Sequence, residues 1–287
     1  MRLASLLLLT ANVVYATSYV ATRLVLDDVP PATLAFLRVV LGAAVLVPLG
    51  RREPQPTARG RLFWMGALGF AAAFALSNWG IRSSSATNAA LLIIVEPLAL
   101  LTLGPVLLGE RLTRREAMGA AAAVAGALVV VFDGIPGVTG RVLPHWRGDL
   151  LLILSGLAYA SYSLLGRTIL TAANATAVTA RSIVWGTVVM APLAALEWAA
   201  GARPVPTPLA VAGTLYLAVV ITAGGYLLWN VGLARMEASR AAAFLTVQPV
   251  VGALLGALVL GERVTIFTAI GGALIVVGLW MTVTGRR

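Results

Sequence analysis

Two prolines, each directly preceded by a polar residue, mark where this chain could do chemistry inside apolar segments. Glu96 precedes Pro97, and Gln248 precedes Pro249, each near the middle of an apolar run. A proline inside a helix donates no backbone hydrogen bond and clashes with the carbonyl group four residues earlier. We therefore expect both helices to loosen one turn before the proline, so that Pro97 and Pro249 act as hinges beside a polar side chain.

Glu96 is the one acidic residue near the centre of any apolar run. A charge at the centre of a bilayer costs about 2.5–3.5 kcal/mol on insertion scales, so this carboxylate must be paired, protonated or in contact with water. One interpretation is a protonatable group or a group that binds the amine of a solute. The other is a buried, hydrogen-bonded structural group, which Gln248 favours because a neutral amide fills the matching position of the second half.

Aromatic and amide side chains inside the runs form a second group of candidates. Tyr15 and Tyr159 lie in the middle of runs, where they could stack on a planar solute and offer it a hydroxyl group. Ordinary helix packing is the alternative for both, and amides such as Asn78 and Asn230 also hold helices or turns together. The candidate solute-binding residues are Tyr15, Tyr19, Asn78, Trp79, Asn88, Glu96, Tyr159, Tyr162, Trp185, Tyr226, Asn230 and Gln248.

Two arginines lie about five residues inside apolar runs, Arg38 and Arg181. The default interpretation is that each snorkels to a nearby surface or pairs with a carbonyl group. The alternative is that they attract a carboxylate solute or form gates.

The composition is that of a membrane protein. Of 287 residues, 60% are hydrophobic and 11% are charged, and the mean hydropathy is +0.93. The net charge of +10 is carried by arginines at the ends of apolar runs, so no basic domain is available for nucleic acid. The absence of cysteine excludes disulfides and thiolate metal sites, and we expect no metal and no cofactor.

Ten apolar runs can be read along the chain, and most are long enough to cross a bilayer as a helix. Their approximate bounds are 3–26, 31–49, 62–80, 86–108, 116–132, 149–169, 177–199, 208–230, 240–260 and 265–284. The first run resembles a signal peptide, since Arg2 precedes it and Val14-Tyr15-Ala16 resembles a cleavage site. Its match to the sixth run favours keeping it in the mature protein.

The two halves of the chain repeat each other. Residues 86–113 align without a gap on residues 238–265, at an offset of 152, so that Gly109-Glu110-Arg111 falls on Gly261-Glu262-Arg263. At an offset of 144, Tyr15 falls on Tyr159. We therefore expect a five-helix repeat over 1–132, a connecting loop over 133–148, and a second repeat over 149–287. An odd number of crossings per half turns the second half upside down, which is the plan of many secondary transporters.

Arginine placement predicts the orientation in the membrane. With the N-terminus inside, 13 of the 21 basic residues, all of them arginine, lie at inner helix ends and six at outer ends. Since positive residues are enriched on the cytoplasmic side, we expect both termini in the cytoplasm.

Two five-helix halves, each with a Glu-Pro or Gln-Pro helix that ends in Gly-Glu-Arg, resemble the EamA family of the drug/metabolite transporter superfamily. Within it, the chain is similar to the YddG-type bacterial exporters of aromatic amino acids. This resemblance implies a basket of ten helices with a central cavity, walled mainly by helices 1, 3, 4, 6, 8 and 9, while helices 5 and 10 are peripheral. It also implies a multi-pass protein of the bacterial inner membrane.

The expected function is secondary transport, with a small-molecule solute and the lipid bilayer as partners. Alternating access would export small metabolites, with aromatic amino acids favoured, and no nucleotide-binding loop points to ATP. A carrier of another metabolite, such as a nucleotide sugar, is the alternative. A membrane-embedded enzyme is disfavoured because His145 and the four aspartates lie at or beyond the ends of the runs, and a channel is disfavoured by the repeat. We expect a monomer, in which the Gly252–Gly256 spacing serves an internal helix contact.

Overall fold

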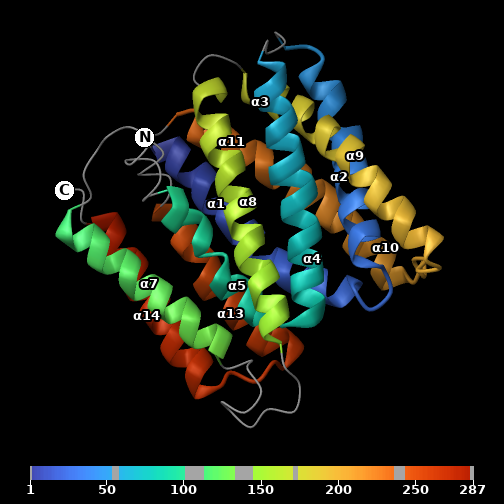
Figure 1. Ribbon diagram of the computed structural model, residues 1–287. Helices are drawn as coiled ribbons and strands as arrows, with labels where there is room; N and C mark the ends of the chain where they lie inside the picture. Colours follow the sequence, from blue (N-terminus) through green and yellow to red (C-terminus); the bar gives the residue numbers. More distant parts are fainter. Residues whose placement is uncertain are drawn as a thin grey trace.

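The computed structural model describes residues 2–53, 58–100, 113–132, 145–170, 174–235 and 243–284, and every regular element in these ranges is a helix (Figure 1). In chain order the elements are α1 (Arg2–Val25), α2 (Pro31–Gly50), α3 (Arg59–Trp64), η1 (Met65–Ala72), α4 (Ala73–Ser83), α5 (Ala86–Leu92), α7 (Arg114–Phe132), α8 (Trp146–Leu170), α9 (Ala175–Ala199), α10 (Pro208–Leu215), η2 (Tyr216–Gly225), α11 (Tyr226–Leu233), η3 (Ala243–Thr246), α13 (Val247–Leu260) and α14 (Ile266–Thr284).

These elements make up ten apolar helices in the described part of the chain, as the ten runs predict. Seven are long and apolar enough to cross a membrane, and three are shorter, Ala86–Leu100, Val247–Leu260 and Ile266–Met281. Residues 101–112 and 236–242 lie outside the described residues, and with them the first Gly-Glu-Arg and part of two predicted runs. The prediction of an all-helical membrane protein with ten helices is confirmed.

The third and eighth of the ten membrane helices, Arg59–Ser83 and Pro208–Leu233, each contain a π-helical segment that the hydropathy pattern did not indicate. In the third, η1 lies between α3 and α4, and in the eighth, η2 lies between α10 and α11. The offset of 152 places η1 almost on η2. The wider π turn is frequent at functional sites, and here its carbonyl groups accept side-chain donors. Tyr226 donates its hydroxyl to Gly69 O at 3.4 Å, and Thr222 donates to Leu217 O at 2.8 Å.

The two proline helices change geometry at the predicted points. α5 ends at Leu92, the chain forms a turn at 93–94, and helical geometry resumes from residue 95 to residue 100. Pro97 has no N–H group to donate to the carbonyl of Ile93. This carbonyl accepts a hydrogen bond from the Glu96 N–H at 2.9 Å instead. In the second half, the short 3₁₀ helix η3 precedes α13 and contains Leu245, four residues before Pro249.

Three helix pairs each join a helix to its counterpart in the other half: α2 with α9, α5 with α13, and α7 with α14. The α7–α14 pair lies at one edge of the bundle (Figure 1), as the resemblance implies for helices 5 and 10. Its backbones approach closely, since a Cβ atom at Gly126 would lie 2.5 Å from Gly271 O. In the α5–α13 pair, a Cβ atom at Gly252 would lie 2.5 Å from Ala90 Cβ, so the glycine face of α13 packs against α5 inside the chain.

In two of these pairs, a glutamate from one half caps the N-terminus of the counterpart helix in the other half. Glu262, of the second Gly-Glu-Arg, accepts hydrogen bonds from the N–H groups of Ala86 and Thr87, both at 2.8 Å, and from Thr87 Oγ1 at 2.6 Å. Glu197 in α9 does the same for α2, where Thr33 donates from its N–H at 2.7 Å and from Oγ1 at 2.8 Å. A carboxylate is favourable at a helix N-terminus because the first N–H groups have no partner within the helix.

Candidate functional site

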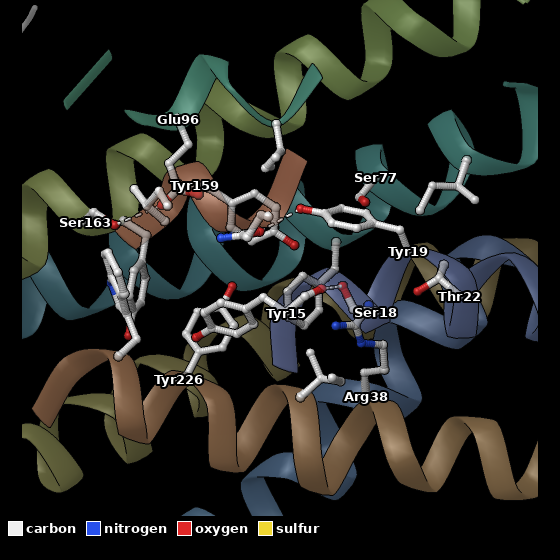
Figure 2. A pocket seen from close by; sticks show the side chains of 18 residues that line it. Tyr15, Ser18, Tyr19, Thr22, Arg38, Ser77, Glu96, Tyr159, Ser163 and Tyr226 are labelled. Carbon is white, nitrogen blue, oxygen red and sulfur yellow. Dashed lines mark hydrogen bonds between the residues drawn. The ribbon is translucent and has the colours of Figure 1, made fainter. Parts of the chain in front are cut away.

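A cavity lies between the two halves (Figure 2). Its walls come from helices of both repeats. The lining residues are Tyr15, Ser18, Tyr19, Thr22, Arg38, Phe74, Ser77, Ile81, Ile93, Glu96, Tyr159, Tyr162, Ser163, Ile221, Tyr226, Trp229, Leu245 and Gln248.

Aromatic rings make up one wall of the cavity. Tyr226 of α11 meets Tyr15 of α1 edge to face, with 5.7 Å between ring centroids, and meets Tyr162 of α8 in the same way at 5.4 Å. Phe74 of α4 lies 6.0 Å from both Tyr159 and Tyr226. Edge-to-face packing holds these rings in place as an aromatic wall that suits a planar solute.

The two polar residues beside the prolines make matching contacts. Ser163 donates to Glu96 Oε1 at 3.3 Å, and Tyr19 donates to Gln248 Oε1 at 2.8 Å. Gln248 in turn donates to Asn12 Oδ1 at 2.7 Å. At the offsets of 152 and 144, Glu96 corresponds to Gln248 and Ser163 to Tyr19, so the same contact between a proline helix and the first helix of a half occurs twice.

Arg38 contributes a cation to the cavity. It is only 4% exposed, and its guanidinium group lies over the ring of Phe74, 4.1 Å from the centroid. Nε donates a long hydrogen bond of 3.4 Å to Thr222 Oγ1. Of the default interpretation, the snorkelling to a surface is therefore wrong for Arg38, because the ring face and the threonine hold the side chain inside. Its repeat counterpart Arg181 is exposed and lies outside the lining.

Seven of the twelve candidate residues line the cavity: Tyr15, Tyr19, Glu96, Tyr159, Tyr162, Tyr226 and Gln248. The hinge residues Pro97 and Pro249 lie next to two of these lining residues in sequence, and neither belongs to the lining itself.

The structure places the other five candidates outside the lining. Asn78 donates to Pro31 O at 2.9 Å, where it ties α4 to the start of α2. Asn230 Nδ2 bonds to Tyr162 Oη at 2.7 Å and to Thr179 Oγ1, so it supports a lining tyrosine from behind. Trp79 is half-buried against the hydrophobic core.

The remaining two candidates, Trp185 and Asn88, also make their contacts outside the lining. Trp185 is 38% exposed and packs edge to face on Phe63, 5.4 Å between centroids. Asn88 donates to Asp149 Oδ1 at 3.1 Å, and Asp149 also accepts from Ser84 and contacts His145 Nδ1 at 2.8 Å. This buried cluster joins the α4–α5 turn to the start of α8.

Several lining residues were not among the twelve candidates. Thr22, Phe74, Ser163 and Trp229 join Arg38, Ser18 and Ser77 in the walls. The repeat could have indicated Ser163, which matches Tyr19 at the offset of 144. Arg38 brings helix 2 into the cavity wall, in addition to the six helices that the resemblance implies.

The arrangement is suited to binding rather than to bond chemistry. Figure 2 shows Glu96 and Arg38 at opposite ends of the cavity with Tyr15 between them. The charged ends and the aromatic wall offer contacts for a small polar solute that also has an apolar part.

Comparison with known proteins decides the family. The model of the EamA-like transporter family matches residues 2–132 and again residues 146–284. The chain belongs to the EamA-like transporter family. It is therefore a multi-pass membrane transporter with a small-molecule solute, not an enzyme, and the resemblance drawn from its motifs is confirmed.

Two relatives of this EamA-like chain carry names that mention a solute. A probable terminal-alkyne amino-acid exporter of Streptantibioticus cattleyicolor is 29% identical over 283 residues, which cover 96% of this chain and 92% of that protein. A probable amino-acid metabolite efflux pump of Escherichia coli K12 is 28% identical over 291 residues, with 98% and 95% covered. A solved crystal structure shares the fold, with a TM-score of 0.69, 22% identity, and 99% and 98% of the two chains covered.

Proposed function

We propose that this EamA-like transporter exports amino acids, with aromatic ones favoured, across the bacterial inner membrane. The observation that carries the proposal is the central cavity, which both halves build and which tyrosine rings from α1, α8 and α11 line. The names of the two relatives support amino acids as the solute class.

Transport would proceed by alternating access between two halves of opposite orientation, with both termini in the cytoplasm. The breaks before Pro97 and Pro249 supply the flexible points, and α4 and α11 would move with the proline helices. The chain is proposed to act as a monomer, since three helix pairs join the two halves within the same chain.

The test is exchange in liposomes that hold the purified protein. Labelled phenylalanine, tryptophan, threonine and a nucleotide sugar are offered outside, with and without the unlabelled solute inside. We expect saturable, stereospecific exchange of phenylalanine and tryptophan, faster than that of threonine. Exchange of the nucleotide sugar alone would replace the solute class, while unsaturable flux without counterflow would indicate a channel.

Glu96→Gln is expected to lower phenylalanine exchange about tenfold without loss of folding. An amide fits at this position, as Gln248 shows in the other half, but it cannot take up and release a proton during a transport cycle, as the carboxyl group of Glu96 can. The measurement is the initial rate of exchange against concentration, with Asp27→Asn as control, because Asp27 lies at the exposed end of α1 and pairs with Arg23. Unchanged exchange in Glu96→Gln would assign this carboxylate a structural role.

A further inference from the structure

Arg38 stands out among the polar residues of the cavity because it is a fixed cation that has no anionic partner among the described residues. Arg38 is 4% exposed as a whole residue and lines the cavity. A buried charge is costly unless it is paired, and breaking such a pair costs more than forming it gains. In the part of the chain that the structure describes, no carboxylate forms an ion pair with Arg38.

Three elements hold the guanidinium group in one orientation. α2 supplies the residue, the ring of Phe74 from α4 covers one face at 4.1 Å, and Thr222 from η2 accepts the Nε–H. Thr222 is itself fixed, because its hydroxyl donates to Leu217 O within the π segment at 2.8 Å. The π geometry of η2 therefore contributes to the position of a group in the solute cavity.

The donors that remain are arranged to bind an anion. Stacking on a ring uses the face of the guanidinium plane and leaves its N–H groups, which point along the plane, available. Nε is the one guanidinium nitrogen of Arg38 that donates a hydrogen bond to a described residue, so Nη1 and Nη2 remain to bind a solute. Two parallel N–H donors match a carboxylate in a bidentate pair.

The negative group of the cavity does not satisfy Arg38. Glu96 lies at the opposite end in Figure 2 and accepts its hydrogen bond from Ser163. Figure 2 shows Tyr15 between Glu96 and Arg38. Because the ammonium and carboxylate groups of an α-amino acid share one carbon atom, a solute whose carboxylate binds Arg38 also places its ammonium group near Arg38.

We propose that Arg38 is the anchor for the carboxylate group of the solute and sets its orientation in the cavity. The carboxylate binds Nη1 and Nη2 of Arg38, and the side chain of the solute extends along the tyrosine rings toward Glu96. The ammonium group then lies near Arg38, within reach of the hydroxyl groups of Tyr15 and Ser18. This inference rests on the proposed function, whose solutes are amino acids, and assigns which of their groups the cavity recognises.

The test measures binding separately from transport. Three probes are titrated against the purified protein, with thermal stabilisation as the readout: phenylalanine, phenylalaninamide, which lacks the carboxylate charge, and 3-phenylpropionate, which lacks the ammonium group. We expect the wild type to bind the two carboxylates about tenfold to a hundredfold more tightly than the amide. In Arg38→Gln this preference should disappear.

Two further variants keep the test decisive. Arg38→Lys retains the charge but loses the planar fork, so it should recover part of the preference and exclude simple misfolding as the cause. Arg181→Gln is the matched control, because it removes the repeat counterpart of Arg38 from an exposed position outside the cavity lining, and it should keep the full preference.

The outcomes separate this inference from the proposed function. If the wild type binds the carboxylates preferentially but exchanges no amino acid in liposomes, the proposed function fails and the anchor stands. If amino acids are exchanged but Arg38→Gln keeps the preference, or if the wild type binds the amide as tightly as phenylalanine, the anchor is wrong. Absence of binding of all three probes to the wild type would also overturn it.

Discussion

Replacement of Gly69 by leucine is expected to abolish solute exchange. Gly69 lies in η1, where even a Cβ atom would overlap the ring and the Cβ atom of Tyr162 in α8. Added carbon atoms in a closely packed site cost about 1–3 kcal/mol or more, because neighbouring side chains leave their preferred rotamers. Tyr162 would have to move, and it is the residue that Asn230 fixes at 2.7 Å.

The displacement would spread through the aromatic wall of the cavity. Tyr162 packs edge to face on Phe70 and on Tyr226, with 5.4 Å between centroids in both pairs. Tyr226 also donates its hydroxyl to the carbonyl of Gly69 itself. A larger residue at position 69 therefore disturbs both the packing of η1 on Tyr162 and the hydrogen bond between Tyr226 and the Gly69 carbonyl.

Gly60→Leu is the matched control for this experiment. Gly60 lies on α3 of the same transmembrane helix, and no atom lies within 4 Å of the position that its Cβ atom would take. Exchange rates and thermal unfolding are measured for both variants in the same liposomes and detergent. We expect Gly60→Leu to match the wild type, and equal activity of the two variants would show that η1 tolerates movement of Tyr162.

The sequence predicted those features of the fold that depend on local signals. Ten helices follow from run length and hydropathy, which are strong signals because lipid requires every backbone group to be paired within the segment. The breaks near Ile93 and Leu245 follow from the missing N–H groups of Pro97 and Pro249. The equivalence of Glu96 and Gln248 follows from the repeat, whereas their partners Ser163 and Tyr19 appear only in the structure.

Features that depend on tertiary contacts could not be read from the sequence. Arg38 lies near a run end, where snorkelling is the usual outcome, and only the positions of Phe74 and Thr222 show that it turns inward. The π segments leave no composition signal, because they are as apolar as the α-helices that flank them. Likewise, Asn230 and Tyr162 both read as candidate solute ligands, yet only Tyr162 lines the cavity and Asn230 supports it.

The Gly-Glu-Arg motif shows how a sequence signal can be clear while its role stays hidden. Its repetition identified the two halves, but the spacing gave no indication of what the glutamate does. In the structure, Glu262 follows the end of α13 and caps the start of α5, which is its repeat counterpart. The second copy of the motif therefore joins the two proline helices.

Glu262→Gln is accordingly expected to open this end of the bundle. The amide keeps one acceptor oxygen, but it loses the charge that favours the helix N-terminus and brings an N–H₂ group toward the donors of Ala86 and Thr87. Hydrogen bonds to charged groups contribute about 1.5–3 kcal/mol, so the equilibrium between a closed and an open end should shift about tenfold to a hundredfold.

Spin labels on Ser83→Cys and Arg263→Cys report this opening, since both positions are exposed and flank the cap. The chain has no native cysteine, so the labels attach at these two sites alone. Pulsed electron–electron double resonance should give a longer and broader distribution of distances between the two labels in Glu262→Gln. Glu197→Gln provides the matched control, because Glu197 caps α2 through an equivalent set of donors. Glu197→Gln should leave the distance between the labels at positions 83 and 263 unchanged. An identical distribution in wild type and Glu262→Gln would mean that helix packing, including the close approach of Gly252 to Ala90, holds this end closed without the carboxylate.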